Sequence, residues 1–229
     1  LVAAGELAGS LAHELHQPMS AINAYAESAM LLSSSEHTEL NGKNKDTLRK
    51  TLDQIIKESI RASEIVRGLR SFFIGGASNI KLADVDRLVA ETVSQLESYA
   101  QKLNVQLKIE KLSEPVWVMV DITQVKTALG NLIKNAIESA NSNGFVEVKI
   151  AFDKQQRIEI SIFDSGKTLD IYETEIIFKP FYSGKKDGLG LGLSISKSLI
   201  ENNDGSISYR SKPKKCFVVS LPTGSRIDV

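Results

Sequence analysis

Two segments near the N-terminus carry mostly apolar residues at alternating spacings of four and three. The first has Leu7, Leu11, Leu15, Pro18, Ile22, Tyr25, Ala29 and Leu32, and the second has Leu48, Leu52, Ile55, Ser59, Ala62, Val66, Leu69 and Phe73. A spacing that averages about 3.5 is typical of a coiled coil or a helical bundle. The polar stretch SSSEHTELNGKNK between them contains a glycine and indicates a loop. The pattern therefore predicts a helical hairpin over residues 1–74.

A single hairpin of this kind buries only one face of each helix. Two hairpins that pair would cover the remaining apolar surface, so we expect a homodimer held by a four-helix bundle. The alternative is that the apolar stripe packs on the rest of the same chain. The narrow stripe, and a remainder long enough to form its own core, favour the dimer.

A hinge or domain boundary is expected at Gly75 and Gly76, where the pattern changes. Amphipathic helices are predicted after Asp84 and after Asp121, both plausible N-caps, and over GLGLSISKSLIENN. Strands are predicted for NVQLKIEK, PVWVMV, FVEVKIAFD, RIEISIFD, DGSISYRS and KCFVVSLP, the third and fourth as a hairpin. Without regular alternation of strand and helix, residues 75–229 should form an α/β sandwich of the α+β class, a mixed sheet with helices on one face. The fold is thus multidomain, α plus α+β.

Composition excludes several classes of function. The 229 residues include 28 Lys and Arg against 28 Asp and Glu, and this zero formal charge argues against a strongly basic nucleic-acid binder. Cys216 is the single cysteine, which excludes an internal disulfide and a multi-cysteine zinc site. No apolar run reaches the roughly 20 residues needed to span a bilayer, and no signal peptide is expected. Because the chain begins with Leu1, we expect a piece of a longer protein.

The segment AHELHQP, residues 12–18, is the first candidate site. His13 lies two positions from the apolar stripe on either side, about 200° round the helix, so we expect it to face solvent. A neutral imidazole is a competent nucleophile, and the adjacent Glu14 can fix its tautomer. Gln17 follows one turn later, and Pro18 should bend the helix. The alternative is an exposed helix with histidines that have no role.

Two further motifs combine polar side chains with buried elements. Asn131 and Asn135 in NLIKNAIES share one helical face, where they either cap backbone groups or hold Mg²⁺ beside phosphates. Asp164 in IFDSGKTLD ends a strand, and Gly166 allows a tight turn. That carboxylate either accepts a hydrogen bond from an exocyclic amine such as that of adenine or forms an ordinary Asx turn.

The segment FYSGKKDGLGLGLSIS is the fourth candidate. Gly188, Gly190 and Gly192 precede a helix, so backbone N–H groups could approach phosphates there. Lys185 and Lys186 lie just upstream. The segment is neither a P-loop nor a Rossmann turn, since it lacks both spacings.

The four motifs, in this order, resemble a sensor histidine kinase over essentially the whole chain. Residues 1–74 resemble the dimerisation and phosphoacceptor hairpin, and residues 75–229 resemble the catalytic ATP-binding domain of the Hsp90/MutL/gyrase type. The segments AHELHQP and NLIKNAIESA, with a short SGKKD lid, are most similar to the oxygen, dicarboxylate and nitrogen-regulation sensors. The resemblance implies autophosphorylation of a histidine and transfer to an aspartate of a response regulator, and it also allows the reverse phosphatase activity.

The resemblance assigns roles to individual residues. His13 would be the phosphoacceptor, Glu14 the acidic residue that activates it, and Gln17 the residue that orients water for dephosphorylation of the partner, whereas His16 need have no role. The nucleotide would be bound by Asn131, Lys134, Asn135, Asp164, Gly166, Phe178, Phe181, Lys185, Gly188, Gly190 and Gly192. Among these, Asn135 would be the Mg²⁺ ligand and Asp164 would read adenine.

One position departs from the family pattern DxGxG, because Thr168 replaces the second glycine. A β-branched residue disfavours positive φ, so the loop could be reshaped there. This leaves a catalytically inactive nucleotide-binding scaffold as one alternative. An ATP hydrolase is the other, although such members of the superfamily have a glutamate where this chain has Asn131.

The implied ligands are ATP and Mg²⁺, and the implied partners are a second copy of the chain and a response regulator receiver domain. No nucleic-acid partner is expected. The fragment should be cytoplasmic, and its parent should be anchored in the inner membrane through a missing N-terminal sensor portion.

Overall fold

The computed structural model describes residues 2–33, 42–73, 79–185 and 190–224. The chain divides into two compact units, Leu1–Phe73 and Ile74–Val229, which are described one at a time. Gly75 and Gly76, where the boundary was expected, lie outside the described residues. Within the described ranges, no helix is both long enough and apolar enough to cross a membrane.

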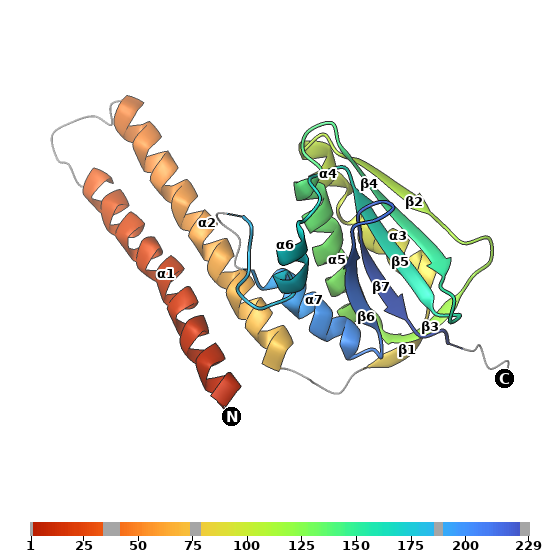
Figure 1. The fold of residues 1–229 in the computed structure, drawn as a ribbon. Coiled ribbons are helices and arrows are strands. Elements are labelled where there is room, and N and C mark those ends of the chain that lie inside the picture. The colour runs from red at the N-terminus through yellow and green to blue at the C-terminus, as the bar shows by residue number, and fades with distance from the viewer. Residues whose placement is uncertain (1, 34–41, 74–78, 186–189, 225–229) are drawn as a thin grey trace. The chain divides into compact units, whose positions relative to one another are not determined.

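The first unit is a pair of helices, α1 (Val2–Ser33) and α2 (Gly42–Phe73), that pack along each other (Figure 1). The α1 positions of the predicted stripe are buried or half-buried where their side chains are described: Leu15, Pro18, Ile22, Tyr25, Ala29 and Leu32. The described part of the stripe thus forms one packed face of α1, and the predicted hairpin is confirmed.

The stripe on α2 is only partly covered by α1. Of its described positions, Leu48, Ile55 and Ala62 are half-buried, whereas Leu52, Ser59 and Val66 are exposed. Two apolar residues of α2 outside the stripe, Ile56 and Ile60, are also exposed, with exposed fractions of 57% and 56%. Because these exposed positions fall within one arc of the helix, the hairpin leaves an apolar face uncovered.

The second unit is built on a five-stranded mixed sheet in the order β2-β4-β5-β7-β6. The β2–β4 pair is parallel, and the other neighbours are antiparallel. The strands are β2 (Gln106–Glu110), β4 (Phe145–Phe152), β5 (Ile158–Asp164), β6 (Ser206–Arg210) and β7 (Cys216–Leu221). The predicted hairpin of FVEVKIAFD and RIEISIFD is the β4–β5 pair, with Val146 opposite Asp164.

The remaining elements include two that the pattern did not predict. Strand β1 (Ile80–Asp84) pairs with β3 (Trp117–Asp121) in a separate two-stranded sheet, and the short helix α6 covers Ile171–Ile176. The other helices are α3 (Val85–Ser94), α4 (Glu97–Lys102), α5 (Ile122–Ser139) and α7 (Gly192–Glu201). The expected single helix after Asp84 is wrong, because a tight turn in which Leu96 N–H bonds to the Val93 carbonyl divides it.

The two faces of the five-stranded sheet differ in polarity. Val148, Ile160 and Ile162 are essentially inaccessible to solvent, and helices α5 and α7 lie on that side of the sheet (Figure 1). The opposite face carries the ion pairs Lys108–Glu147, Lys149–Glu110 and Arg210–Glu159, which are partly or largely exposed. The sheet is therefore covered by helices on one face, as the pattern predicted.

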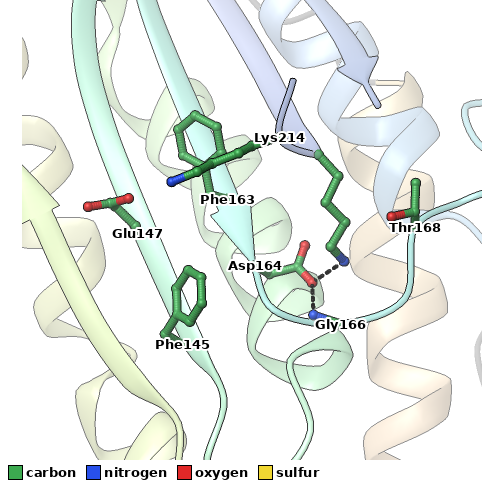
Figure 2. Close-up of a pocket in the computed structure, with 8 residues that line it drawn as sticks. Phe145, Glu147, Phe163, Asp164, Gly166, Thr168 and Lys214 are labelled. Carbon is green, nitrogen blue, oxygen red and sulfur yellow. Dashed lines mark hydrogen bonds and ion pairs between the residues drawn. The ribbon is translucent and has the colours of Figure 1, made fainter. Parts of the chain in front are cut away.

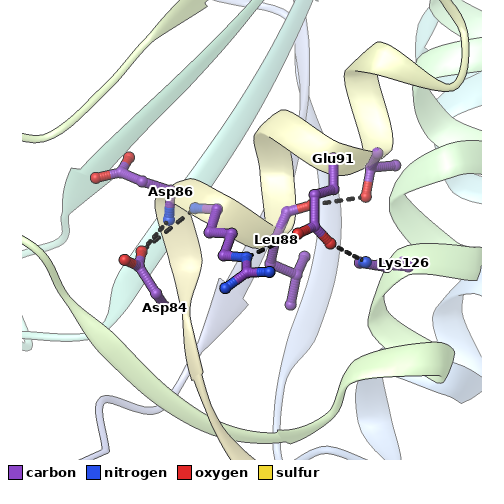
Figure 3. A network of polar contacts seen from close by, with 7 residues as sticks. Asp84, Asp86, Leu88, Glu91 and Lys126 are labelled. Atoms are coloured by element: carbon purple, nitrogen blue, oxygen red, sulfur yellow. Dashed lines mark hydrogen bonds and ion pairs between the residues drawn. The ribbon is translucent and has the colours of Figure 1, made fainter.

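Polar contacts join α3 to α5, the helix that carries the two asparagines (Figure 3). Asp84 caps α3 by accepting hydrogen bonds from the backbone N–H groups of Asp86 and Arg87. Glu91, two turns along α3, pairs with Lys126 of α5 and with Arg87. Hydrogen bonds from Lys126 and Arg87 lower the pKa of Glu91 to about 2. The network therefore fixes α3 against α5 through a carboxylate that stays ionised in mild acid.

Candidate functional site

The α5 helix divides its residues between the core and a polar face. Asp121 caps it by accepting hydrogen bonds from the backbone N–H groups of Thr123 and Gln124. Its buried positions are Val125, Ala128, Leu129, Leu132, Ile133, Ala136 and Ile137. Four polar positions in its C-terminal half are half-buried: Asn131, Lys134, Asn135 and Glu138. Tight packing of the apolar side thus places a row of amides and charges at the edge of the core.

Asn131 connects this polar face to the start of α7. Its Nδ2 donates to Ser196 Oγ at 3.5 Å, and Ser196 Oγ donates to the Gly192 carbonyl at 2.8 Å. Ser196 is fully buried. The structure therefore brings together Asn131 and Gly192, which the sequence places in two separate motifs.

Lys185 reaches the same polar face from the segment that follows α6. Its ammonium forms an ion pair with Glu138 and donates to Asn135 Oδ1 at 3.3 Å. Glu138 also accepts a hydrogen bond from the Tyr99 hydroxyl at 2.8 Å. Burial raises the pKa of Glu138, but the hydrogen bonds from Lys185 and Tyr99 outweigh it, so the pKa is lowered overall. Sequence reasoning missed Glu138, although its place three positions after Asn135 puts it on the same helical face.

Asp164 lies at the end of β5 and is almost fully buried, with its side chain 5% exposed. Its Oδ1 accepts hydrogen bonds from the Gly166 backbone N–H at 2.8 Å and from Lys215 Nζ at 2.5 Å (Figure 2). Lys215 precedes β7 and is itself 10% exposed. Sequence reasoning missed Lys215, because it is brought near Asp164 only by the β5–β7 pairing, in which the neighbouring residues Phe163 and Cys216 lie opposite each other.

Gly166 is required by packing and not by its backbone angles. A Cβ at this position would lie 2.1 Å from the Ser139 carbonyl oxygen and 2.2 Å from Ser139 Oγ. Its φ is outside the left-handed region, and the predicted tight turn is present, since the Gly166 N–H bonds back to Asp164 Oδ1. The absent side chain lets the loop after β5 lie directly on the C-terminal end of α5.

Thr168 fits the loop without backbone strain. It is not among the described residues with positive φ, so its β-branched side chain meets no conformational penalty. Thr168 lines a hollow of about 330 Å³ at this end of the sheet, together with Phe145, Glu147, Phe163, Asp164, Gly166, Lys214 and Lys215 (Figure 2). The departure from the family pattern therefore leaves the hydrogen bond between Gly166 N–H and Asp164 Oδ1 in place.

The segment before α7 has an unusual backbone. Phe181 has φ of 66°, and Gly190 also has φ of 66°. A bulky residue seldom adopts this conformation, which costs about 1–3 kcal/mol and is often found at functional sites. A Cβ on Gly190 would lie 2.4 Å from the Phe181 carbonyl carbon, so the backbones at Phe181 and Gly190 touch directly.

Phe178, the other predicted aromatic residue, packs on the sheet. Its ring contacts the ring of Phe217 in β7 edge-on, with the ring centroids 6.2 Å apart.

Several predicted residues lie outside what the structure describes. These are Lys186 and Gly188, and the side chains of His13 and Glu14, whose backbones belong to α1. Gln17 and His16 are exposed on α1, and His16 Nδ1 lies 3.4 Å from Ser20 Oγ. The structure thus gathers the nucleotide-type residues in the second unit and the histidine segment in the first.

The buried carboxylate offers the clearest opening for a ligand. Asp164 Oδ2 accepts no hydrogen bond from the residues that the structure describes, although buried polar oxygens are nearly always bonded. A donor on a bound molecule would satisfy this oxygen.

In the described part of the chain, no three His, Cys, Asp or Glu side chains gather to hold a metal ion. A cation bound at the polar face of α5 would instead rely on amide oxygens such as Asn135 Oδ1 and on phosphate oxygens.

Comparison with protein families assigns a different model to each unit. Residues 3–74 match the His Kinase A (phospho-acceptor) domain. Residues 120–225 match the histidine kinase-, DNA gyrase B-, and HSP90-like ATPase. The second match includes Asn131, Asn135, Asp164, Gly166, Gly190 and Gly192.

Two curated proteins illustrate the similarity along the chain. Sensor protein FixL of Bradyrhizobium diazoefficiens is 33% identical over 210 residues, which cover 90% of this chain and 40% of that protein. The C4-dicarboxylate transport sensor protein DctS of Rhodobacter capsulatus is 28% identical, over 97% of this chain and 34% of that protein. The chain therefore spans less than half the length of either relative.

A solved structure shares the fold of both units. Histidine kinase ThkA in its complex with the response regulator protein TrrA aligns with a TM-score of 0.75 and 25% identity, over 96% of this chain and 62% of that one. The catalytic domain of ThkA alone aligns with a TM-score of 0.58 and 29% identity, over 63% of this chain and 95% of that one.

Proposed function

Because the chain belongs to the sensor histidine kinases, we propose that it phosphorylates His13 from ATP and passes the phosphoryl group to an aspartate of a response regulator receiver domain. The observation that carries this proposal is the buried Asp164 carboxylate, whose Oδ2 accepts no hydrogen bond from the described part of the chain and whose loop packs on the end of α5 through Gly166. A pocket of this kind suits a nucleotide base next to a polyphosphate.

The roles of the second unit follow from this geometry. Asp164 Oδ2 accepts a hydrogen bond from the exocyclic amine of adenine. The phosphates are assigned to Asn131, Lys134, Asn135, Lys185, Gly190 and Gly192, with Phe178 and Phe181 in the segment between α6 and α7. Gly188 is assigned to them by its place in the glycine motif alone. Backbone N–H groups at the start of α7 favour negative charge there, since a helix N-terminus carries a partial positive charge.

Asn135 is the residue of this face best suited to a magnesium ion. Its Oδ1 already accepts a hydrogen bond from the Lys185 ammonium, so it faces a place where positive charge is accepted. A bound Mg²⁺ would neutralise the charge of the phosphate oxygens. Because the ligand is a neutral amide, the nucleotide supplies most of the balancing negative charge.

The first unit supplies the acceptor. His13 provides a neutral ring nitrogen as the nucleophile, and Glu14 holds the tautomer that leaves this nitrogen unprotonated. Phosphoryl transfer needs little covalent help from the protein, so positioning and neutralisation of charge dominate. Nearby His16 has no part in the reaction and serves as a built-in control.

The experiment that tests this function compares His13→Ala with His16→Ala in the full chain. After incubation with γ-labelled ATP and Mg²⁺, the wild type and His16→Ala should both carry label that is lost in acid and kept in base. His13→Ala should carry none, while it binds ATP as the wild type does. Label retained on His13→Ala would refute the assignment of the acceptor.

Gln17 gives the chain a second, reverse activity. Its side chain is exposed on α1, one turn after His13, where it orients water against the aspartyl phosphate of the docked regulator. Gln17→Ala should therefore dephosphorylate the regulator at least tenfold more slowly, with autophosphorylation unchanged. An unchanged rate of dephosphorylation would remove this role.

The two alternatives are less well supported. Asn131 cannot take a proton and is engaged with Ser196, so it makes a poor general base for an ATP hydrolase. Thr168, the one reason to suspect an inactive scaffold, introduces no backbone strain. Free phosphate released without phosphohistidine would favour hydrolysis, and ADP binding without either product would favour the scaffold.

The uncovered face of α2 supports a homodimer. Leu52, Ile56, Ile60 and Val66 are each about half exposed, more apolar surface than one helix normally leaves in water. A second hairpin that packs on this face completes a four-helix bundle and brings two acceptor helices together. ATP and a receiver domain are both cytoplasmic, so we propose that the chain acts there, within a longer sensor protein anchored in the membrane.

A further inference from the structure

Lys215 is a buried cation whose position needs an explanation. Its side chain is 10% exposed, and Nζ donates to Asp164 Oδ1 at 2.5 Å and to the Lys167 carbonyl oxygen at 3.0 Å. Burying an ammonium costs several kcal/mol unless good partners compensate for the lost water. The partner here is the very carboxylate that the proposed function assigns to the nucleotide base.

Counting donors and acceptors shows what this pair leaves unused. Asp164 Oδ1 receives two hydrogen bonds, from Gly166 N–H and from Lys215, while Oδ2 receives none from the described residues. The Lys215 ammonium has three N–H donors, and two of them are used in the described part of the chain. One acceptor and one charged donor therefore remain side by side at the end of β5.

We propose that Lys215 and Asp164 read the base as a pair. Asp164 Oδ2 accepts from the exocyclic amine of adenine, and the third N–H of Lys215 donates to the neighbouring ring nitrogen N1. This rests on the proposed binding of ATP at Asp164. Adenine presents this combination of donor and acceptor on its Watson–Crick edge, and a charged donor makes the stronger kind of hydrogen bond. Lys215 is thus a specificity-determining residue as well as the link between Asp164 and the loop at Lys167.

The test is a thermodynamic cycle between the residue and the ligand. ADP and 1-deaza-ADP, in which a C–H replaces the acceptor N1, are titrated into the full wild-type chain and into Lys215→Met by calorimetry. The wild type should lose about tenfold in affinity or more on changing to 1-deaza-ADP, the size expected for a hydrogen bond to a charged group. Lys215→Met should bind ADP more weakly and lose less than about twofold on the same change.

A merely structural lysine would give a different result. If Lys215 only holds the loop at Lys167 in place, the wild type and Lys215→Met lose the same fold of affinity on changing from ADP to 1-deaza-ADP, and the proposal is overturned. Equal affinity of the wild type for the two ligands overturns it without any variant. Lys215→Arg keeps a charged donor and should keep most of the discrimination, which covers the case in which Lys215→Met fails to fold.

The same titrations separate this inference from the proposed function. Purine riboside diphosphate lacks only the exocyclic amine and reports on Asp164 alone. If the wild type does not bind ADP, the proposed function itself fails. If it binds ADP more tightly than purine riboside diphosphate but binds ADP and 1-deaza-ADP equally well, then the role of Asp164 stands and only the role of Lys215 is lost.

Discussion

Gly166→Ala offers a direct test of how the loop after β5 is held against α5. The new methyl group would lie 2.1 Å from the Ser139 carbonyl oxygen and 2.6 Å from the carbonyl carbon. Non-bonded carbons rest at about 3.5 Å or more, so the loop or the end of α5 must move by roughly 1 Å. Overpacking of this kind costs about 1–3 kcal/mol, and the lower entropy of the unfolded chain returns only about 0.4–1 kcal/mol.

We therefore expect Gly166→Ala to lower the free energy of unfolding of the second unit by about 1–2 kcal/mol. Because the loop N–H that bonds to Asp164 Oδ1 moves with it, ADP affinity should fall at least tenfold. Urea unfolding followed by the fluorescence of Trp117, the single tryptophan and a residue of β3, reports on this unit, and calorimetry gives the affinity.

Gly192→Ala is the matched control for that experiment. A Cβ at Gly192 meets nothing within 4 Å, and the residue begins α7, so stability should stay within about 0.5 kcal/mol of the wild type or rise. If Gly166→Ala is as stable as Gly192→Ala and binds ADP as the wild type does, the loop does not need direct contact with α5 and the packing argument is wrong.

Three further predictions address charge and assembly. Glu91→Gln should be less stable than the wild type at pH 7, because Lys126 depresses the pKa of Glu91 in the folded state to about 2. The stability gained from this charge is lost as pH falls from about 4.5 towards 2, so the difference between the two proteins should vanish in that range. Unfolding midpoints measured across pH check this, and a constant difference would contradict it. Leu52→Lys should shift the chain towards monomer at least tenfold in sedimentation, whereas Asp53→Lys, also exposed, should not, and equal effects would argue against a dimer through this face. Lys185→Met should weaken ATP binding about tenfold and leave adenosine binding unchanged in calorimetry, since its ammonium lies beside the face assigned to phosphates; equal losses for both ligands would refute that placement.

The periodic elements were predictable because burial imposes a simple repeat on them. The stripe from Leu15 to Leu32 and the alternation in β4 and β5 each record one buried face, and both are confirmed. The caps at Asp84 and Asp121 follow from local hydrogen bonding and are confirmed as well. Strand β1 was not predicted because most of its positions are exposed and do not alternate, and α6 was not predicted because it is under two turns long and buries no residue.

The site was predictable only in part, because its chemistry depends on long-range pairing. Asn131, Asn135 and Asp164 stand out as polar residues in otherwise apolar elements, and each motif contains its own signal. Lys215 lies 51 positions from Asp164 and gives no such signal, since it reaches the carboxylate only when β7 pairs with β5. The turn at Gly166 was predictable, but its close contact with Ser139 was not, because that contact cannot be seen in local sequence.

If ATP bound in the second unit phosphorylates the histidine of the first, the phosphoryl group must be found on the peptide that contains His13. We expect mass spectrometry of the full chain, digested at neutral pH after incubation with Mg²⁺ and ATP, to find one phosphoryl group on that peptide, lost on brief treatment with acid. A phosphoryl group confined to a peptide without His13, or an unmodified chain that nevertheless binds ATP, would contradict it.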